Sequence, residues 1–192
     1  MQTNENVKTP VIVGIVKRVK DNQIFWIISF AILTFFAAQL AVPVKPVPFT
    51  LQTMLILLSG ALLGARNGMF SQFIYLLSGA IGLPVFAGFS FGVAVFAGPT
   101  GGYLLSFPFA AFIVGYLIEK NNKLLTTILS MVLGNMIILL SGTAYLFLFF
   151  GGNFENALLS GALIFSVWDL IKITAAVSIY RALSKKYPKL PE

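Results

Sequence analysis

Several runs of about 20 residues in this chain carry almost no charge, and these runs constrain its fold more than any motif does. The stretch from Leu124 to Phe150 contains no charged side chain at all. A helix needs about 20 apolar residues to span a bilayer, and backbone groups at that depth must be hydrogen-bonded within the protein. With 58% hydrophobic residues and a mean hydropathy of +0.91, the chain is predicted to be an all-α, polytopic membrane protein.

Six membrane-spanning helices can be placed on the chain, at residues 24–42, 50–65, 67–82, 99–118, 123–150 and 154–183. The second and third are short, and the run Gly64-Ala65-Arg66-Asn67-Gly68 between them predicts a tight turn with Arg66 at its apex. Helices joined by so short a connection pack antiparallel, so these two are expected to form a hairpin.

The last two spans are less regular. The fifth is longer than a bilayer requires; Ser141-Gly142-Thr143 marks an expected break, and Gly151-Gly152-Asn153 is expected to end it. The sixth either runs unbroken or divides into a short helix after Asn153 and a span that starts near Val167. In the second version Asp169 lies at the outer end of the last helix instead of at mid-bilayer.

The basic residues predict the orientation, because short loops rich in lysine and arginine stay in the cytoplasm. With the N-terminus inside, the cytoplasmic set is Lys8, Lys17, Arg18, Lys20, Arg66, Lys120, Lys123, Arg181, Lys185, Lys186 and Lys189. Lys45 alone is outside, and Lys172 lies within the membrane. We expect a cytoplasmic segment at residues 1–23, one six-helix domain at 24–184 and a cytoplasmic tail at 185–192, in the plasma membrane.

Composition argues against several classes of function. The chain holds no histidine and no cysteine, which removes thiol and imidazole chemistry and the usual zinc and haem ligands. Its few acidic residues are scattered singly, so we expect no metal site, no cofactor and no catalytic centre. The net charge of +7 fits positive-inside bias and attraction to membrane lipid better than a nucleic-acid surface.

One acid and one base lie within the last apolar run, Asp169 and Lys172 in the sequence SVWDLIKIT. A charge at the centre of a membrane helix costs about 3 kcal/mol on insertion scales. Residues three apart share a helix face, so both side chains can point into one cavity. The functional interpretation is a ligand site, and the alternative is an internal salt bridge without a ligand.

Two outward-facing segments are unusual. Residues 43–48 have the sequence PVKPVP, in which three prolines hold an extended, non-helical backbone. Residues 82–102 form a long, uncharged loop rich in glycine and phenylalanine, and such backbone is tolerated at membrane depth only where it is buried or lines a cavity. We expect a lid over a ligand pocket, with Phe86, Phe89 and Phe91 as candidate walls; the alternative is a re-entrant packing element.

Four runs resemble the BioY family: VPFTLQT (47–53), LLGARNGMFSQFIYLLSGAIGLPVFAG (62–88), GPTGGYLLSFPFAA (98–111) and DLIK (169–172). They keep the family's order and spacing over most of residues 31–180. The family comprises the biotin-binding S components of energy-coupling-factor (ECF) transporters. The resemblance implies a six-helix S-component fold, capture of biotin from outside, and a transmembrane coupling subunit and ABC ATPases as partners. Consistently, the chain has no G-x-x-x-x-G-K-[ST] phosphate loop and should not be an enzyme.

The resemblance also suggests which residues contact biotin, whose carboxylate needs a cation and whose cyclic urea needs acceptors for two N–H groups. Lys172 suits the carboxylate and Asp169 the urea, or else Asp169 mainly fixes the ammonium. The helix start after GPTGG can receive an anion or the urea oxygen, with Thr100 as a cap and Tyr103 beside it. The other candidates are Gln52, Gln72, Tyr75, Phe86, Phe89, Ser90 and Asn135. Interhelical hydrogen bonding is the alternative role of the polar ones.

The first helix carries small residues of the kind through which S components dock on the coupling subunit. The candidates are Ala31, Thr34, Ala37, Ala38 and Ala41, with Phe35 where the family has alanine. The alternative is that they pack inside one bundle. In the last helix, Val167-Trp168 replaces a Pro-Gly pair that commonly precedes the aspartate in the family.

Two other functions compete with biotin capture. One is that of an S component for a different vitamin. The other is a self-sufficient secondary transporter of a small carboxylate, since such proteins also place rare charges at mid-membrane. A secondary transporter predicts internal symmetry, and residues 24–82 and 99–183 show none.

Overall fold

The computed structural model describes residues 22–162, 166–186 and 190. Most of the predicted head and part of the predicted tail lie outside the described residues, as do Lys8, Lys17, Arg18, Lys20 and Lys189. The helices are α2 (Gln23–Gln39), α3 (Gln52–Ala80), α4 (Gly101–Lys120), α5 (Leu124–Phe149), α6 (Phe154–Gly161) and α7 (Ser166–Ser184), with 3₁₀ turns η1 (Ala87–Phe89) and η2 (Val93–Ala97).

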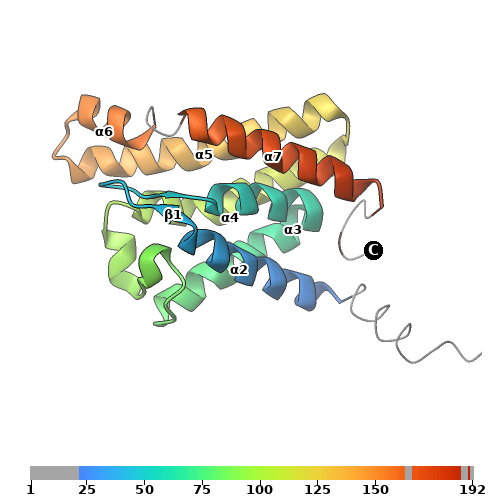
Figure 1. The fold of residues 1–192 in the computed structure, drawn as a ribbon, viewed down its shortest axis with the longest axis horizontal. Coiled ribbons are helices and arrows are strands. Elements are labelled where there is room, and N and C mark those ends of the chain that lie inside the picture. Colours follow the sequence, from blue (N-terminus) through green and yellow to red (C-terminus); the bar gives the residue numbers. More distant parts are fainter. Residues whose placement is uncertain (1–21, 163–165, 187–189, 191–192) are drawn as a thin grey trace, which may run out of the picture.

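The long helices form one elongated bundle with α4 at its centre (Figure 1). Helix α4 packs against α3 on one side and α5 on the other, α2 covers α3, and α7 lies against both α3 and α5. Among the described helices, α3, α4 and α5 are long and apolar enough to cross a membrane, and α2 is a shorter apolar helix. The predicted all-α membrane fold is therefore confirmed.

Helix α3 is two antiparallel arms joined at Gly64, whose backbone is non-helical at φ 80° and ψ 177°. Hydrogen bonds cross between the arms, from Gln72 Nε2 to Ser59 Oγ (3.1 Å) and from Gln52 Nε2 to the Tyr75 hydroxyl (2.6 Å). The predicted hairpin is confirmed, but its turn is tighter than expected. A single glycine in the left-handed region reverses the chain, and exposed Arg66 already belongs to the second arm.

Helix α5 runs without interruption through residues 141–143, so the predicted break there is wrong. Gly142 has a packing role: a Cβ at this position would overlap the ring of Tyr103 on α4. The predicted end of the helix is confirmed, because Gly151 and Gly152 both have positive φ (61° and 89°). Their amides donate to the carbonyls of Leu148 and Phe147, which satisfies the last turn of the helix.

The last predicted span divides into α6 and α7. Asn153 begins α6, since its side-chain oxygen accepts a hydrogen bond from the Asn156 amide (3.0 Å). Helix α7 starts at Ser166, so Asp169 lies in its first turn. The divided placement of this span is the correct one.

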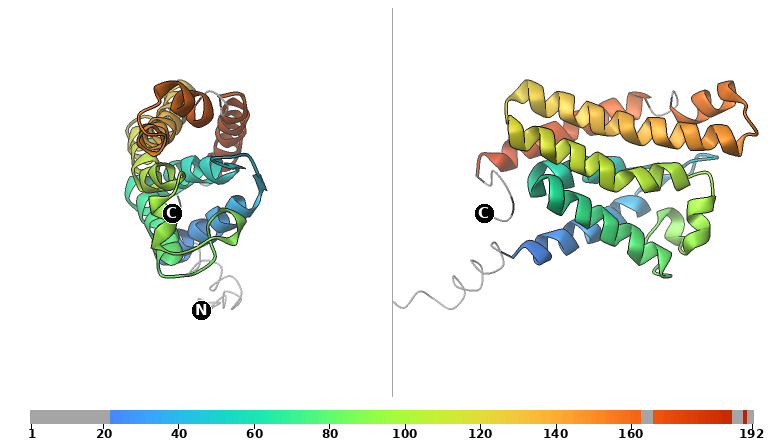
Figure 2. Two further views of the ribbon diagram at one scale, coloured as in Figure 1. Left: turned by 90° about the vertical axis from the view of Figure 1, so that its left-hand side faces the viewer. Right: turned by 180° about the vertical axis from the view of Figure 1, so that it is seen from behind.

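The two ends of the bundle differ in construction (Figures 1 and 2). At one end, called the loop end here, lie α6, residues 81–100, and a small hairpin of β1 (Ala41–Val42) and β2 (Phe49–Thr50) with Ala41 opposite Thr50. The PVKPVP run forms the tip of that hairpin and is not helical, as predicted. At the other, the turn end, lie the Gly64 turn, residues 121–123, the start of α2 and the end of α7.

Four of the five small residues proposed for docking face the inside of the bundle. Ala31, Thr34, Ala37 and Ala38 are at most 7% exposed, and Ala41 is half-buried in β1. The Thr34 hydroxyl is also held within the bundle, by the Phe30 carbonyl (2.8 Å) and Gln72. In the isolated chain these small residues let α2 approach α3 closely while its bulky side chains point outward, and docking through them stays a prediction.

Candidate ligand-binding site

The first two turns of α7 carry a buried ion pair. Lys172 Nζ lies 2.6 Å from Asp169 Oδ1, and the two residues are only 8% and 3% exposed. The same ammonium donates to the Thr50 carbonyl of β2 (3.3 Å), and Asn135 Nδ2 of α5 donates to Asp169 Oδ2 (2.9 Å). Residues from three elements thus fix the pair in position.

These contacts assign different roles to the two charges. Asp169 Oδ2 accepts a hydrogen bond from Asn135, whereas Oδ1 is paired with the Lys172 ammonium by charge and accepts no hydrogen bond from the described residues. An ammonium has three N–H donors, and one of those on Lys172 goes to the Thr50 carbonyl. Lys172 therefore keeps donor capacity for a further acceptor, while Asp169 mainly holds the ammonium.

A cavity of about 180 Å³ opens beside this pair at the loop end. Its wall is contributed by Val47, Pro48, Thr50, Gln52, Thr53, Phe86, Ala87, Ser90, Val95, Thr100, Tyr103, Leu104, Phe107, Ile138, Leu139, Asp169 and Lys172. Its apolar part comes from α4 and α5 and from the loop-end segments in about equal measure, and hydroxyl and amide side chains share the wall with the two charges. Such a mixture suits a ligand with an apolar body and a few polar atoms.

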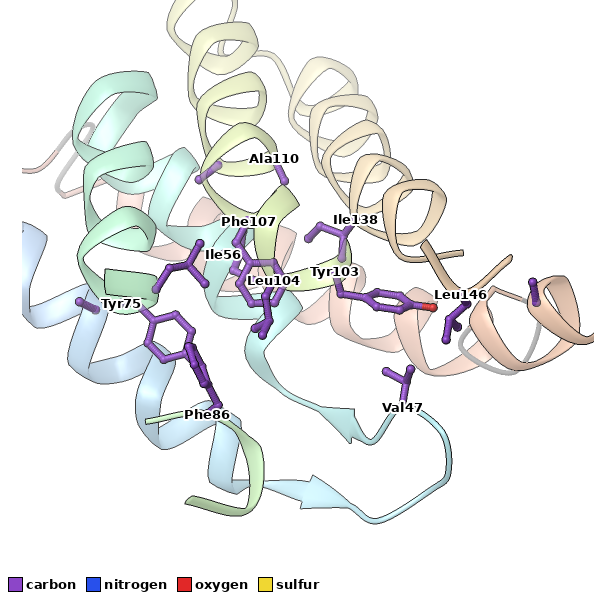
Figure 3. Close-up of a cluster of buried hydrophobic side chains, with 14 residues drawn as sticks. Val47, Ile56, Tyr75, Phe86, Tyr103, Leu104, Phe107, Ala110, Ile138 and Leu146 are labelled. Carbon is purple, nitrogen blue, oxygen red and sulfur yellow. The ribbon is translucent and has the colours of Figure 1, made fainter. Parts of the chain in front are cut away.

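The start of α4 abuts the cavity, as the GPTGG run predicts. Thr100 occupies the position before the helix but its side chain makes no capping hydrogen bond, so the expectation of a side-chain cap is wrong. Tyr103 lines the cavity with its ring, and its hydroxyl donates to the Gly161 carbonyl at the end of α6 (2.7 Å). Figure 3 shows this hydroxyl directed toward Leu146 and away from Phe86.

One phenylalanine of the long loop enters the wall. Phe86 is 1% exposed and packs edge-on against Tyr75, with ring centroids 5.6 Å apart (Figure 3). It also packs edge-on against Phe96, at 5.4 Å. Phe89 and Phe91 are 60% and 58% exposed and lie outside the cavity lining, so their predicted place in the wall is wrong. Gly88 and Phe89 between Phe86 and Phe91 both have positive φ (66° and 57°), which breaks the regular course of the backbone there.

Three other candidates lie behind the wall and do not line the cavity. Gln72 is buried between the arms of α3 and α2, where it bonds Ser59, Ser71 and Thr34. Tyr75 accepts a hydrogen bond from Gln52 and donates to the Val85 carbonyl (3.1 Å), so it supports a lining residue and the loop. Asn135 touches the site only through Asp169.

The lining also includes residues that were not among the predicted contacts. Thr50 and Thr53 line the cavity and lie on either side of Gln52 in the run VPFTLQT. Because that run resembles the family, both threonines could have been predicted as ligand contacts. The Thr53 hydroxyl is buried and has no hydrogen-bond partner among the residues that the structure describes. The apolar lining residues Leu104, Phe107 and Ile138 are indistinguishable in sequence from other core positions.

Comparison with known proteins places this site in a family. The family model described as "BioY family" matches residues 8–189. This chain belongs to the BioY family. It is 41% identical to the probable biotin transporter BioY of Pyrococcus horikoshii over 85% of this chain and 97% of that one. It is 39% identical to the biotin transporter BioY of Thermotoga maritima over 81% of this chain and 92% of the relative.

A solved structure supports the same assignment for the fold. The crystal structure at 2.1 Å of the S-component for biotin from an ECF-type ABC transporter matches with a TM-score of 0.81. The match covers 97% of this chain and 96% of that one, at 28% sequence identity. The BioY chain therefore has the S-component fold expected from its sequence and is a multi-pass membrane protein.

Proposed function

We propose that this BioY protein captures biotin from outside the cell and serves as the substrate-binding subunit of an ECF-type ABC transporter. The observation that carries the proposal is the buried Asp169–Lys172 pair in the wall of a largely apolar cavity. Both relatives named above are described as biotin transporters, and the matched structure is an S-component for biotin.

The cavity offers a partner for each part of biotin. The remaining donor capacity of Lys172 suits the carboxylate, in a site where burial strengthens charge-assisted hydrogen bonds. The cyclic urea needs acceptors for its two N–H groups, which the side chains of Thr50, Thr53 and Gln52 can supply. The apolar ring and chain of the vitamin fit against Phe107 and Ile138.

Titration calorimetry with the purified chain tests this proposal. We expect tight binding of biotin, no binding of thiamine or riboflavin, and much weaker binding of biotin methyl ester, which lacks the carboxylate charge. Binding of another vitamin in place of biotin would contradict the proposed specificity and leave the fold assignment intact.

Two variants test the roles of the charges. Lys172→Ala removes the cation for the carboxylate, and Asp169→Asn removes the group that holds it. Truncating one partner of a buried charge pair costs about 2–5 kcal/mol, so biotin affinity should fall at least thirtyfold in both. Lys123→Ala, at the exposed turn end, is the control. Wild-type affinity in both site variants would disprove the assignment.

Both termini are proposed to be cytoplasmic, with the turn end inside. The helix directions support this orientation, because α2 starts and α7 ends at the turn end, together with Arg66, Lys120, Lys123 and Arg181. The chain has no cysteine, so single cysteines can be labelled without background. A membrane-impermeant maleimide should label Lys45→Cys in intact cells and Lys123→Cys only after lysis; the reverse pattern would invert the topology.

Energy for uptake is proposed to come from a transmembrane coupling subunit and ABC ATPases, and the match to the S-component of an ECF-type ABC transporter supports this. The small residues of α2 that are predicted to dock on the coupling subunit are mostly buried in the isolated chain. Uptake of radiolabelled biotin by cells that express the chain with and without these partners tests the proposal. We expect ATP-dependent stimulation by the partners; uptake that is unchanged by them would argue for a self-sufficient transporter.

A further inference from the structure

The side chain of Gln39, at the last residue of α2, binds the backbone of the long loop at three points. Its Nε2 donates to the carbonyls of Phe86 (3.0 Å) and Val85 (3.4 Å). Its Oε1 accepts from the Phe89 amide (3.1 Å). Both ends of one amide are thus used on a segment 46 to 50 residues away in sequence.

This loop segment needs an external partner for its backbone. Gly88 and Phe89 both have positive φ, at 66° and 57°, and that conformation is unfavourable for phenylalanine. The 3₁₀ turn at residues 87–89 is too short to satisfy the flanking amide and carbonyl groups by itself. Gln39 supplies those partners, and it is the only polar side chain of α2 after Thr34.

The same segment forms one wall of the cavity. Phe86, Ala87 and Ser90 line it, and the Phe86 ring fills the space above Gly79 so closely that a Cβ there would overlap the ring. Tyr75 gives the segment a second attachment through the Val85 carbonyl. Further along, the Gly92 amide donates to the Gly79 carbonyl (2.8 Å), while the side chains of Phe89, Phe91 and Val93 are each at least 58% accessible.

We infer that Gln39 is a positioning residue for ligand retention, which fastens residues 85–89 to α2 and keeps the Phe86 wall closed over a bound ligand. The inference rests on the proposed function, and it adds a link between α2 and the cavity. A displacement of the loop end of α2 would withdraw the partners of Val85, Phe86 and Phe89 together. The wall then keeps only its attachment through Tyr75 and the packing of the Phe86 ring, so its hold on a ligand weakens.

Two substitutions separate the bonds that Gln39 makes. Gln39→Leu removes all of them while keeping a side chain of similar size. Gln39→Glu keeps an oxygen for the Phe89 amide but loses the donor to Phe86. Gln23→Leu is the matched control, because Gln23 is the exposed first residue of the same helix. Thermal unfolding of all three verifies that each variant is folded.

Ligand retention is measured as the dissociation rate of biotin from the full-length chain in nanodiscs. We expect dissociation about tenfold faster in Gln39→Leu and Gln39→Glu, with a smaller change in the association rate. Gln23→Leu should match wild type. Dissociation at the wild-type rate in both Gln39 variants would overturn the inference.

Hydrogen exchange gives a readout that does not need biotin. In the ligand-free chain, amide exchange in a peptide that covers residues 85–90 should be about tenfold faster in Gln39→Leu and near wild type in Gln39→Glu, which retains the acceptor for Phe89. If wild type binds no biotin but exchange is still faster in Gln39→Leu, the proposed function is wrong, while the attachment of residues 85–89 to Gln39 is supported. If exchange is unchanged in Gln39→Leu, the attachment itself is refuted.

Discussion

Several glycines at the two ends of the bundle pack against different kinds of atoms. Toward the turn end, a Cβ on Gly60, Gly68 or Gly115 would overlap backbone atoms of a neighbouring segment, such as the Ala111 carbonyl or the chain at Gly64 and Ala65. Toward the loop end, a Cβ on Gly79 or Gly142 would first meet an aromatic ring, that of Phe86 or Tyr103, although Gly101 and Gly102 there lie against the Phe96 and Ser141 carbonyls.

The difference separates a fixed part of the molecule from an adjustable one. Backbone segments in direct contact cannot yield without moving whole helices, whereas a ring can rotate or shift within its own side chain. The glycines of the turn end thus hold the helices together. At the loop end, where the cavity lies, Gly79 and Gly142 pack against rings that can shift, whereas Gly101 and Gly102 are held against backbone.

The largest effect is expected from Gly115→Ala, at the turn end. Alanine gains about 1 kcal/mol in helix propensity. The overlap with the backbone of Gly64 and Ala65 outweighs this gain, since overpacking a tight contact commonly costs 1–3 kcal/mol and more where nothing can shift. We expect about 3 kcal/mol or more of destabilisation, seen as loss of the monodisperse peak in size-exclusion chromatography. If Gly115→Ala folded as well as wild type, the turn end would not be more rigid than the loop end.

A smaller effect, confined to the cavity, is expected from Asn135→Ala. It leaves Asp169 Oδ2 without its donor in a buried site, which costs about 1–3 kcal/mol. The chain should fold, and calorimetry should show biotin affinity reduced about tenfold as the carboxylate loses its fixed orientation. Asn121→Ala, at the exposed turn end, is the control. Equal affinities would mean that Asn135 does not act through Asp169.

Gly142→Ala is the loop-end counterpart of the glycine change. The added methyl displaces the Tyr103 ring, which can move, so the free energy of unfolding should fall by only about 1 kcal/mol. Biotin should bind several-fold more weakly, because this ring lines the cavity. Adding Tyr103→Leu should restore stability in a double-mutant cycle. A collapse as severe as that of Gly115→Ala would show that both ends are equally rigid.

The smallest effect is expected from Tyr75→Phe, which removes one hydroxyl and its two hydrogen bonds to Gln52 and Val85. Interhelical hydrogen bonds contribute about 0.6–2 kcal/mol in membrane proteins, so stability should fall by about 1 kcal/mol. Fluorescence-detected thermal unfolding is the measurement, with exposed Tyr116→Phe as the control. A variant indistinguishable from Tyr116→Phe would show that the loop is held without Tyr75.

Most of the fold was predictable because apolar runs and glycine turns are local signals. The six spans and the α3 hairpin follow from them, and the division of the last span was already one of two stated alternatives. The helix break predicted at Gly142 was wrong, because a glycine that leaves space for a neighbouring aromatic ring cannot be distinguished in sequence from one that ends a helix. Which role applies depends on Tyr103, 39 positions earlier in the chain.

Some residues of the site were predicted correctly from the sequence and others were not. The charge pair stood out because charges are rare in apolar runs. The small residues of α2 were predicted to dock on a partner, and the structure places four of them against α3, since small residues commonly pack between helices in membrane proteins while bulky ones face lipid. Phe86, Phe89 and Phe91 are equivalent in composition, and only the backbone conformation around Gly88 decides which ring enters the wall.

The position of Asp169 and Lys172 on the last helix has a consequence for biosynthesis. Their partners Asn135 and Thr50 lie on segments that leave the ribosome earlier, so the site is completed only when α7 packs against them. The two charges are one turn apart and neutralise each other, which lowers the barrier to inserting this helix. A nascent chain that stops short of α7 therefore lacks the ion pair proposed to bind the ligand, and Asn135 and Thr50 are then without their partners on α7.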